Sequence, residues 1–450
     1  MTRARLGGMF LLLLGSVLFV AVGSVKEHIS GSMCDFKNVY YAGRCLLEHC
    51  DPYQRNELKS VYLTSGGDHP TPFLVEAVTT YVYLPTIFLI TGPLALLPWG
   101  PAHLLWMAVT ACAVIFAAIL IWNPGAQYAP LITGCFIGFL LANSVWLLMV
   151  GNPAGIAVGL CVVAVWCFLQ ERFLHFGVLC LAISLVIKPH DSGLIWAYFL
   201  LAGKAYRKRA LQTLALAFLL SLPGIVWISH VAPNWVHELN SNILAASARG
   251  GLSDPGPAGH VPDSANAVID LQTAISVFWD DPEIYNPASY LLCGILLLLW
   301  GLATLRAPPS PSSAWLALAV VAPLSMLPVY HMQHDARLLL LTFPACASLW
   351  AKGGLLGWFA LLMNAASVVL SGDIVSVLRI HLVRNLLATS SGFSQKVLTV
   401  LLGRPVPLAL LGLGVLYLWV YMDRAFGWSG PTNARHGDFD HRQVRTIGET

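Results

Sequence analysis

Ionisable side chains are rare in this 450-residue chain, and the candidates for chemistry fall in a few short clusters. The densest cluster is Tyr330-His331-Met332-Gln333-His334-Asp335-Ala336-Arg337, which separates two apolar stretches. It predicts a polar floor that binds a phosphate or a sugar through His331, His334, Asp335 and Arg337. The alternative is a hydrated turn capped by Asp335. A metal on His331, His334 and Asp335 is not expected, because i, i+3, i+4 spacing alone is weak evidence for a metal site.

Two aspartates in the first polar segment are candidate carboxylates. Asp35 comes shortly after the first apolar stretch and starts a segment with helical periodicity. It predicts either a helix N-cap or a carboxylate that acts as a catalytic base. Asp51, in Asp51-Pro52-Tyr53, is expected in a turn and is the second-choice carboxylate.

A third cluster, Lys188-Pro189-His190-Asp191, interrupts a long apolar stretch. Lys188 and Asp191 can neutralise each other as an intrahelical i, i+3 pair. Alternatively, Lys188 offers a cation to an anionic head group. Asn152, in Gly151-Asn152-Pro153, is interpreted as a turn residue.

The elements that must position these residues are membrane helices. The chain is 57% hydrophobic and 10% charged, with a mean hydropathy of +0.70, whereas soluble domains carry about 25% charged residues. Apolar blocks near 20 residues match the hydrocarbon core of a bilayer. Twelve spans are expected, near 6–25, 81–98, 102–122, 128–149, 153–170, 173–203, 210–230, 288–305, 313–330, 336–350, 354–372 and 406–422. Because 173–203 contains Pro189, it can also be two short spans.

Basic residues orient this predicted bundle. With both termini on one side, four basic clusters share the cytoplasmic face: Arg3/Arg5, Lys204/Arg207/Lys208/Arg209, Arg306 and Lys352. Residues 1–422 then form a single domain, with outer loops 26–80, 231–287 and 373–405 and a polar cytoplasmic tail, 423–450. A net charge of +3 gives no reason to expect nucleic acid as a partner.

The first outer loop contains an amphipathic pattern. Phe36, Val39, Tyr40, Gly43, Leu46 and Leu47 share one face at helical spacing, and Lys37, Asn38, Arg44 and Glu48 share the other. Such a helix is expected to lie flat in the membrane interface. Cys34, Cys45 and Cys50 fall in the same loop. They are expected to be unpaired, with one disulfide as the alternative if the loop is extracytoplasmic.

Several of these patches, in order, resemble glycosyltransferase family 87, whose members have the GT-C fold. The segment Asp35-Phe36-Lys37-Asn38-Val39-Tyr40-Tyr41-Ala42, closing with Asp51-Pro52-Tyr53, is similar to the family's first outer loop. Tyr83-Leu84-Pro85, Gly92-Pro93-Leu94-Ala95-Leu96-Leu97-Pro98, Gly151-Asn152, Ile187-Lys188-Pro189 and the Tyr330–Pro344 region match loosely in order over about residues 6–350. The region before Asp51 departs from the family, because Glu48-His49-Cys50 replaces its usual Gly.

The resemblance implies an all-α GT-C bundle of about 12 spans in the cell (inner) membrane, with its active site facing outward. It implies transfer of a hexose, such as mannose, from a polyprenyl-phosphate donor to a lipid or glycan acceptor, with inversion. Asp35 would be the catalytic base. The expected substrate-binding residues are His331, His334, Asp335, Arg337, Lys188, Arg44, Tyr40 and Asp51. Neither a metal nor another cofactor is expected.

Two other function classes stay open, a transporter or lipid flippase and a non-catalytic membrane scaffold. The scaffold would not need His331, His334 and Asp335 on the same side as Asp35. A transporter or lipid flippase would also be polytopic with a buried Lys and Asp, but it should show paired broken helices in two halves. The sequence shows one clear break, at Pro189. A GT-C transferase that uses another sugar donor is the enzymatic alternative.

Overall fold

The computed structural model describes residues 2–26, 33–65, 71–256, 268–308, 310–376 and 392–427, apart from the side chain of residue 205. These residues are mostly helical, and the one β-bridge among them joins Val268 to Met332. Six described stretches are long and apolar enough to cross a membrane: Arg3–Val25, Trp99–Ala126, Pro130–Val150, Tyr206–Val231, Pro282–Arg306 and Val406–Phe426. The chain is therefore an all-α, multi-pass membrane protein.

The long helices are apolar around most of their circumference, because their outer faces contact lipid and not water. They are α1 (Arg3–Lys26), α6 (Trp99–Ala126), α7 (Pro130–Ala142) with α8 (Val145–Val150), α12 (Lys204–Val231), α15 (Pro282–Arg306) and α21 (Val406–Phe426). On α1, Phe10 and Val17 are each 63% exposed. In a soluble protein so many exposed apolar side chains would promote aggregation. In a membrane the hydrocarbon chains of the lipids surround them.

Shorter apolar helices fill the rest of the bundle. They are α5 (Phe88–Ala95) with the 3-10 turn η1 (Pro85–Ile87), α9 (Ala154–Leu169), α10 (Leu174–Ile187), α16 (Pro311–Ser325) and α18 (Gly354–Leu370). The predicted span 173–203 is divided at Lys188 into α10 and α11 (Pro189–Leu201). The predicted span 336–350 is a 3-10 helix, η3 (Gln333–Thr342), followed by α17 (Phe343–Lys352). The described residues thus form six long apolar stretches and several shorter apolar helices, and not twelve uniform spans.

Close helix packing in the bundle depends on glycines. A Cβ at Gly134 of α7 would clash with the carbonyl oxygen of Gly8 in α1, and one at Gly138 would clash with that of Leu11. Gly15 of α1 approaches the backbone of Gly138 in the same way. Gly134 and Gly138 form a small-xxx-small pair, which lets two helix backbones approach inside a membrane.

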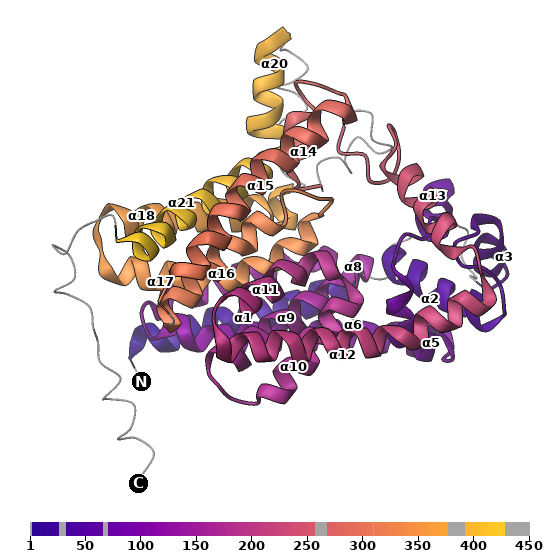
Figure 1. The fold of residues 1–450 in the computed structure, drawn as a ribbon, viewed down its shortest axis with the longest axis horizontal. Coiled ribbons are helices and arrows are strands. Elements are labelled where there is room, and N and C mark those ends of the chain that lie inside the picture. Colours follow the sequence, from indigo (N-terminus) through magenta and orange to yellow (C-terminus); the bar gives the residue numbers. More distant parts are fainter. Residues whose placement is uncertain are drawn as a thin grey trace.

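The described parts of the three predicted outer loops lie toward the same end of the bundle (Figure 1). They contain α2 (Cys34–Leu47), α3 (Arg55–Ser65), α13 (Trp235–Ser247), α14 (Leu271–Ile275) and α20 (Gly392–Leu398). In Figure 1 they lie at the right and the top, away from the N-terminal start of α1 at the lower left. The assignment of 26–80, 231–287 and 373–405 to the outer side of the membrane stays a prediction. The predicted tail 423–450 falls largely outside the described residues.

Helix α2 is mostly buried, which corrects the expectation of an exposed polar face; its position in the membrane interface stays a prediction. Lys37 and Asn38, expected on its polar face, are 8% and 4% exposed. The Asn38 amide donates to backbone oxygens of α4 (Pro72–Thr79) and the residue after it, at 2.8 Å to Val78. Only the C-terminal polar residues Arg44 and Glu48 reach the surface, and they pair with each other at 3.1 Å.

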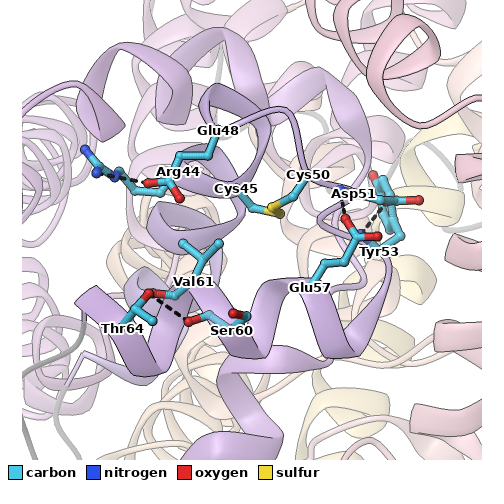
Figure 2. Close-up of a disulfide and its surroundings, with 10 residues drawn as sticks. All are labelled: Arg44, Cys45, Glu48, Cys50, Asp51, Tyr53, Glu57, Ser60, Val61 and Thr64. Atoms are coloured by element: carbon cyan, nitrogen blue, oxygen red, sulfur yellow. Dashed lines mark hydrogen bonds and ion pairs between the residues drawn. A yellow bond between two sulfur atoms is a disulfide. The ribbon is translucent and has the colours of Figure 1, made fainter.

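Cys45 and Cys50 form a disulfide between the end of α2 and the turn that follows (Figure 2). Their Cα atoms are 5.0 Å apart, and Cys34 is free. The expectation of three unpaired loop cysteines is therefore wrong, and the alternative of one disulfide holds. Spacing alone could not predict the pair, because the turn at Glu48-His49 brings the two residues together.

Candidate functional site

The helix break at Lys188 positions the buried cation of the candidate site. Lys188 lies between α10 and α11 with φ −150° and ψ 81°, because the following Pro189 disfavours helical geometry at this position. Its buried ammonium group contacts the carboxylate of Asp335 directly and lies 3.6 Å from Asp191. The predicted pairing with Asp191 is present, but the tighter partner comes from a segment 147 residues away.

Asp335 stabilises the turn at the start of η3, which is the segment that meets Lys188. One carboxylate oxygen accepts the backbone N–H of Met332 at 2.7 Å, and the other contacts Lys188. Asp335 therefore caps the turn, as one interpretation of the sequence has it. The turn is not hydrated, however, because His331, His334 and Asp335 are all at most 7% exposed.

His331 is enclosed beside Asp191 and His190. Its Nδ1 lies 2.8 Å from the carbonyl oxygen of Val329, and its Nε2 lies 3.4 Å from Asp191 Oδ1. The rings of His190 and His331 meet edge to face, with centroids 5.0 Å apart. Burial lowers the pKa of His331, but the carboxylates of Asp191 and Asp335 outweigh burial and raise it. The position thus attracts positive charge.

Asp35 lies in the first turn of α2 and is oriented by an amide. Asn152 Nδ2 donates to Asp35 Oδ2 at 2.7 Å, while Asn152 Oδ1 accepts the N–H of Ala154 at 2.8 Å. Asp35 is half-buried, so its other oxygen is not sealed from a substrate. The N-cap interpretation is wrong, because Met33 occupies the capping position and Asp35 bonds to a distant side chain.

The charge of Asp35 acts on the same groups as the Lys188 segment, which places them in one polar cluster. Burial raises the pKa of Tyr83 well above its ordinary value, and the charges of Asp35 and Asp335 raise it further. The pKa of Tyr330 is raised in the same way, by burial and then by Asp35. Burial lowers the pKa of His334, which leaves its imidazole neutral near pH 7. The two phenols and this imidazole are therefore neutral hydrogen-bonding groups.

Tyr40 and Arg44 do not face this cluster. The Tyr40 hydroxyl is bound to the carbonyl oxygen of Leu97 at 2.8 Å, and burial raises its pKa. Arg44 donates to the carbonyl oxygen of Ala95 and pairs with Glu48. Both side chains fix α2 against the end of α5.

Asp51 lies beyond the far end of α2 from Asp35, about 20 Å along the chain at 1.5 Å per helical residue. Its carboxylate accepts the N–H of Tyr53 at 2.9 Å, and its own N–H donates to Glu57 at 2.7 Å (Figure 2). Partial burial raises its pKa, as does the neighbouring Glu57. Asp51 is the turn residue that the sequence predicts, and it does not join Asp35.

Arg337 is enclosed and serves the architecture. It is 1% exposed, and its guanidinium donates to the carbonyl oxygens of Gln333 and Asn143 at 2.7 and 2.9 Å. It also pairs with Asp373 at 3.2 Å, which in turn accepts the N–H of Trp146, the second residue of α8. A substrate phosphate cannot reach this cation without repacking.

The structure therefore brings together five predicted site residues: Asp35, Lys188, His331, His334 and Asp335. It leaves Tyr40, Arg44, Asp51 and Arg337 in structural roles. Sequence reasoning missed Asn152 as a partner of Asp35, because Gly-Asn-Pro is typical of a turn. Gly151 does adopt a positive φ of 67°, so the turn exists, but the same turn presents the amide to Asp35.

No protein-family model matches this chain, and no curated protein or solved structure matches it significantly. The residues themselves must therefore support any function.

Proposed function

We propose that this chain is a membrane glycosyltransferase of the GT-C type, related to family 87. It would move a hexose, such as mannose, from a polyprenyl-phosphate carrier to a lipid or glycan hydroxyl, with inversion. The observation that supports it most is the half-buried carboxylate of Asp35, held by Asn152 at 2.7 Å beside the buried Lys188 cluster.

In this mechanism Asp35 is the general base. Asp35 Oδ1, whose only hydrogen-bond donor among the described residues is the weak Cys34 thiol, accepts the proton of the acceptor hydroxyl as the hydroxyl oxygen forms a bond to the anomeric carbon. The bond from the anomeric carbon to the phosphate oxygen breaks on the opposite face, and polyprenyl phosphate leaves with the electron pair. Inversion follows from this single displacement.

The leaving phosphate needs positive charge or hydrogen-bond donors. Lys188 is the cation of the cluster on which the charge of Asp35 acts, and Tyr83 and His334 hold protons that they can donate. A lipid-linked donor reaches such a site from within the bilayer, so no nucleotide-binding fold is required. Lipids of the surrounding membrane are the expected partners of the exposed apolar helices.

The disulfide supports an outward-facing site in the cell (inner) membrane. Disulfides persist in oxidising compartments, and Cys45, one half of the Cys45–Cys50 disulfide, lies on the same helix as Asp35. The basic residues at the opposite end of the bundle, Lys204 to Arg209 among them, favour the cytoplasm.

The test uses the full chain in nanodiscs with radiolabelled polyprenyl-phosphate-mannose and a membrane lipid extract. We expect labelled product from the wild type. Asp35→Asn should lower the transfer rate by about 100-fold or more, the usual contribution of a general base. Asp51→Asn, an equivalent change at the other end of α2, should keep near-wild-type turnover. An active Asp35→Asn variant would remove Asp35 from the mechanism, and absence of transfer with every polyprenyl-phosphate sugar tried would refute the function.

The discontinuous α10–α11 helix with its buried Lys188 favours a second candidate, a transporter or lipid flippase. The same nanodisc preparation, reconstituted into sealed vesicles, separates the two. A flippase would move a fluorescent polyprenyl-phosphate sugar between leaflets without forming a glycosylated product.

A further inference from the structure

Asp191 is a buried carboxylate whose hydrogen-bonding capacity is unused. It is 1% exposed, yet neither of its oxygens accepts a hydrogen bond. The closest cation is the Lys188 ammonium at 3.6 Å, and that group contacts Asp335 more tightly. A buried carboxylate left this way is costly unless another positive ligand satisfies it.

His331 faces the same carboxylate with an unpartnered nitrogen. Because a carbonyl oxygen only accepts, the contact between Nδ1 and Val329 assigns the proton of the neutral ring to Nδ1. The lone pair is then on Nε2, which has no hydrogen-bond partner and lies 3.4 Å from Asp191 Oδ1. Two lone pairs that face each other in a buried site repel, and either a proton on Nε2 or a metal ion between the two atoms removes that repulsion.

The separations of Asp191 Oδ1 from the two imidazole nitrogens suit a metal ion better than a shared proton. His190 Nε2 lies 3.6 Å from the same Asp191 oxygen, and ligand atoms of all three residues lie within 4.8 Å of one another. A proton shared between a ring nitrogen and a carboxylate gives about 2.7–2.9 Å. A tetrahedral ion with ligands at about 2.0–2.1 Å separates them by about 3.3–3.4 Å.

The charge of the surroundings also favours a cation. Three carboxylates act on the single ammonium of Lys188, those of Asp191, Asp335 and Asp35. Among these four groups the balance is negative, which attracts a divalent cation.

We propose that His190, Asp191 and His331 bind a divalent transition-metal cation, Zn²⁺ by the preference of the donor set. Two imidazoles and one carboxylate make up the protein side of a catalytic zinc site, with a fourth position open. The contact between His331 Nδ1 and Val329 is the outer-shell bond that such a ligand requires. His190 is exposed and completes the set from the first turn of α11. This assignment revises the expectation that the chain holds no metal.

The open position suggests a role that rests on the proposed function. An ion there would meet the phosphate of a lipid-linked donor and offset the excess of carboxylates around Lys188. Binding of the ion itself depends only on the three side chains, so it is measured separately from transfer.

Metal binding is tested on the full chain, purified in detergent with a tag that contains no histidine and stripped with a chelator. After equilibration with Zn²⁺ and desalting, we expect about one Zn²⁺ per chain by elemental analysis. Co²⁺ should give the visible absorption of a tetrahedral site. Asp191→Asn and His331→Gln should each weaken binding at least tenfold. His334→Gln, a neighbouring imidazole outside the set, should keep the wild-type metal content.

Monodisperse wild-type protein that retains less than about a tenth of an equivalent would overturn the site. So would an Asp191→Asn/His331→Gln double variant that binds like the wild type. Transfer assays on stripped and reloaded protein separate the two proposals. Bound metal without transfer under any condition refutes the proposed function alone, whereas transfer by fully stripped protein that binds no Zn²⁺ refutes the metal site alone.

Discussion

At the scale of single residues, the partner of Asp35 matters as much as its own identity. Asn152 accepts the N–H of Ala154 with its amide oxygen and donates to Asp35 Oδ2 from its nitrogen, while in the described part of the chain Asp35 Oδ1 has only the weak donor Cys34 Sγ at 3.6 Å. The hydrogen bond from Asn152 orients a base without neutralising it. Asn152 is therefore a positioning residue in the proposed reaction.

Asn152→Leu should slow transfer by about 10- to 100-fold, since a hydrogen bond to a charged group contributes about 1.5–3 kcal/mol. Asn152→Asp should shift the acid limb of the kcat/KM profile to higher pH, because a second carboxylate raises the pKa of Asp35. A purely structural role for Asn152 would leave that limb in place. The measurement is the pH–rate profile of each variant against the wild type.

A second residue-scale prediction concerns Asp270, the N-cap of α14. Burial raises its pKa to about 6, although Thr273, His331 and Arg404 all act to lower it. The folded state therefore holds the proton more tightly than the unfolded state, with an ordinary pKa of 3.8. Its contribution to stability is greatest below pH 3.8 and declines as pH rises to about 6, by about 3 kcal/mol at most.

Asp270→Asn removes this titration and keeps a side chain that can cap α14. Thermal midpoints in detergent at pH 4.5 and 7 should therefore differ less in the variant than in the wild type. Relative to the wild type, the stability of the variant should be more favourable at pH 7 than at pH 4.5, because at pH 7 the wild type has a buried carboxylate that is ionised. An equal pH dependence in both proteins would mean that Asp270 is ionised in the folded state across this range.

At this scale the sequence predicted several residues that the structure groups in the candidate site, and the residues it misassigned have a common cause. Asp35, Lys188 and the His331–Asp335 turn were identified because ionisable groups are conspicuous among apolar residues. Arg337 was conspicuous for the same reason, yet it is enclosed by Asp373 and backbone oxygens. Residue type cannot distinguish a cation that holds helices together from one that awaits a ligand. Nor can it show that Asp191 and His331 meet, since their pairing is fixed by tertiary packing.

At the scale of elements, breaks and turns decide which residues meet. Pro189 predicted the division of 173–203, and the structure places Lys188 at that point. The amphipathic pattern of α2 predicted a helix correctly. It did not predict that protein would cover the polar face of that helix. Its polar residue Asn38 bonds to the segment around Val78, so a polar face is satisfied by protein and not by water. Periodicity reports which residues share a face, not what covers that face.

The disulfide is the element-scale feature with the clearest test. In the chain-entropy account a loop this short contributes about 2 kcal/mol. The Cys45→Ser/Cys50→Ser double variant should therefore have a measurably lower thermal midpoint. Cys45 is fully buried, so the change also places a hydroxyl group in the protein interior. Cys112→Ser, at an exposed free thiol, should change it little.

Thiol counting checks the pairing directly. The unreduced, denatured chain should offer eight alkylable thiols, which are its free cysteines, and the reduced chain should offer all ten. Ten thiols without reductant would contradict the bond.

At the scale of the whole molecule, hydropathy predicted the membrane class and could not predict span geometry. Blocks such as 336–350 are apolar enough to be counted as spans, but Leu338 to Leu341 lie in a buried 3-10 helix and not on a lipid face. A segment surrounded by protein and one surrounded by lipid have the same composition. The outer position of 26–80, 231–287 and 373–405 stays a prediction.

Assembly of the bundle depends on the contact between α1 and α7, where Gly138 allows two backbones to touch. Replacing a helical Gly with Ala usually stabilises by about 0.5–1 kcal/mol, because Gly loses more backbone entropy. Gly294→Ala in α15, where nothing lies within 4 Å of the added methyl group, should show that gain. Gly138→Ala should instead destabilise, because its methyl group would clash with the carbonyl oxygen of Leu11 and separate the helices. Thermal midpoints and monodispersity of the two variants in one detergent provide the comparison, and an equal gain in both would mean that α1 is not packed closely on α7.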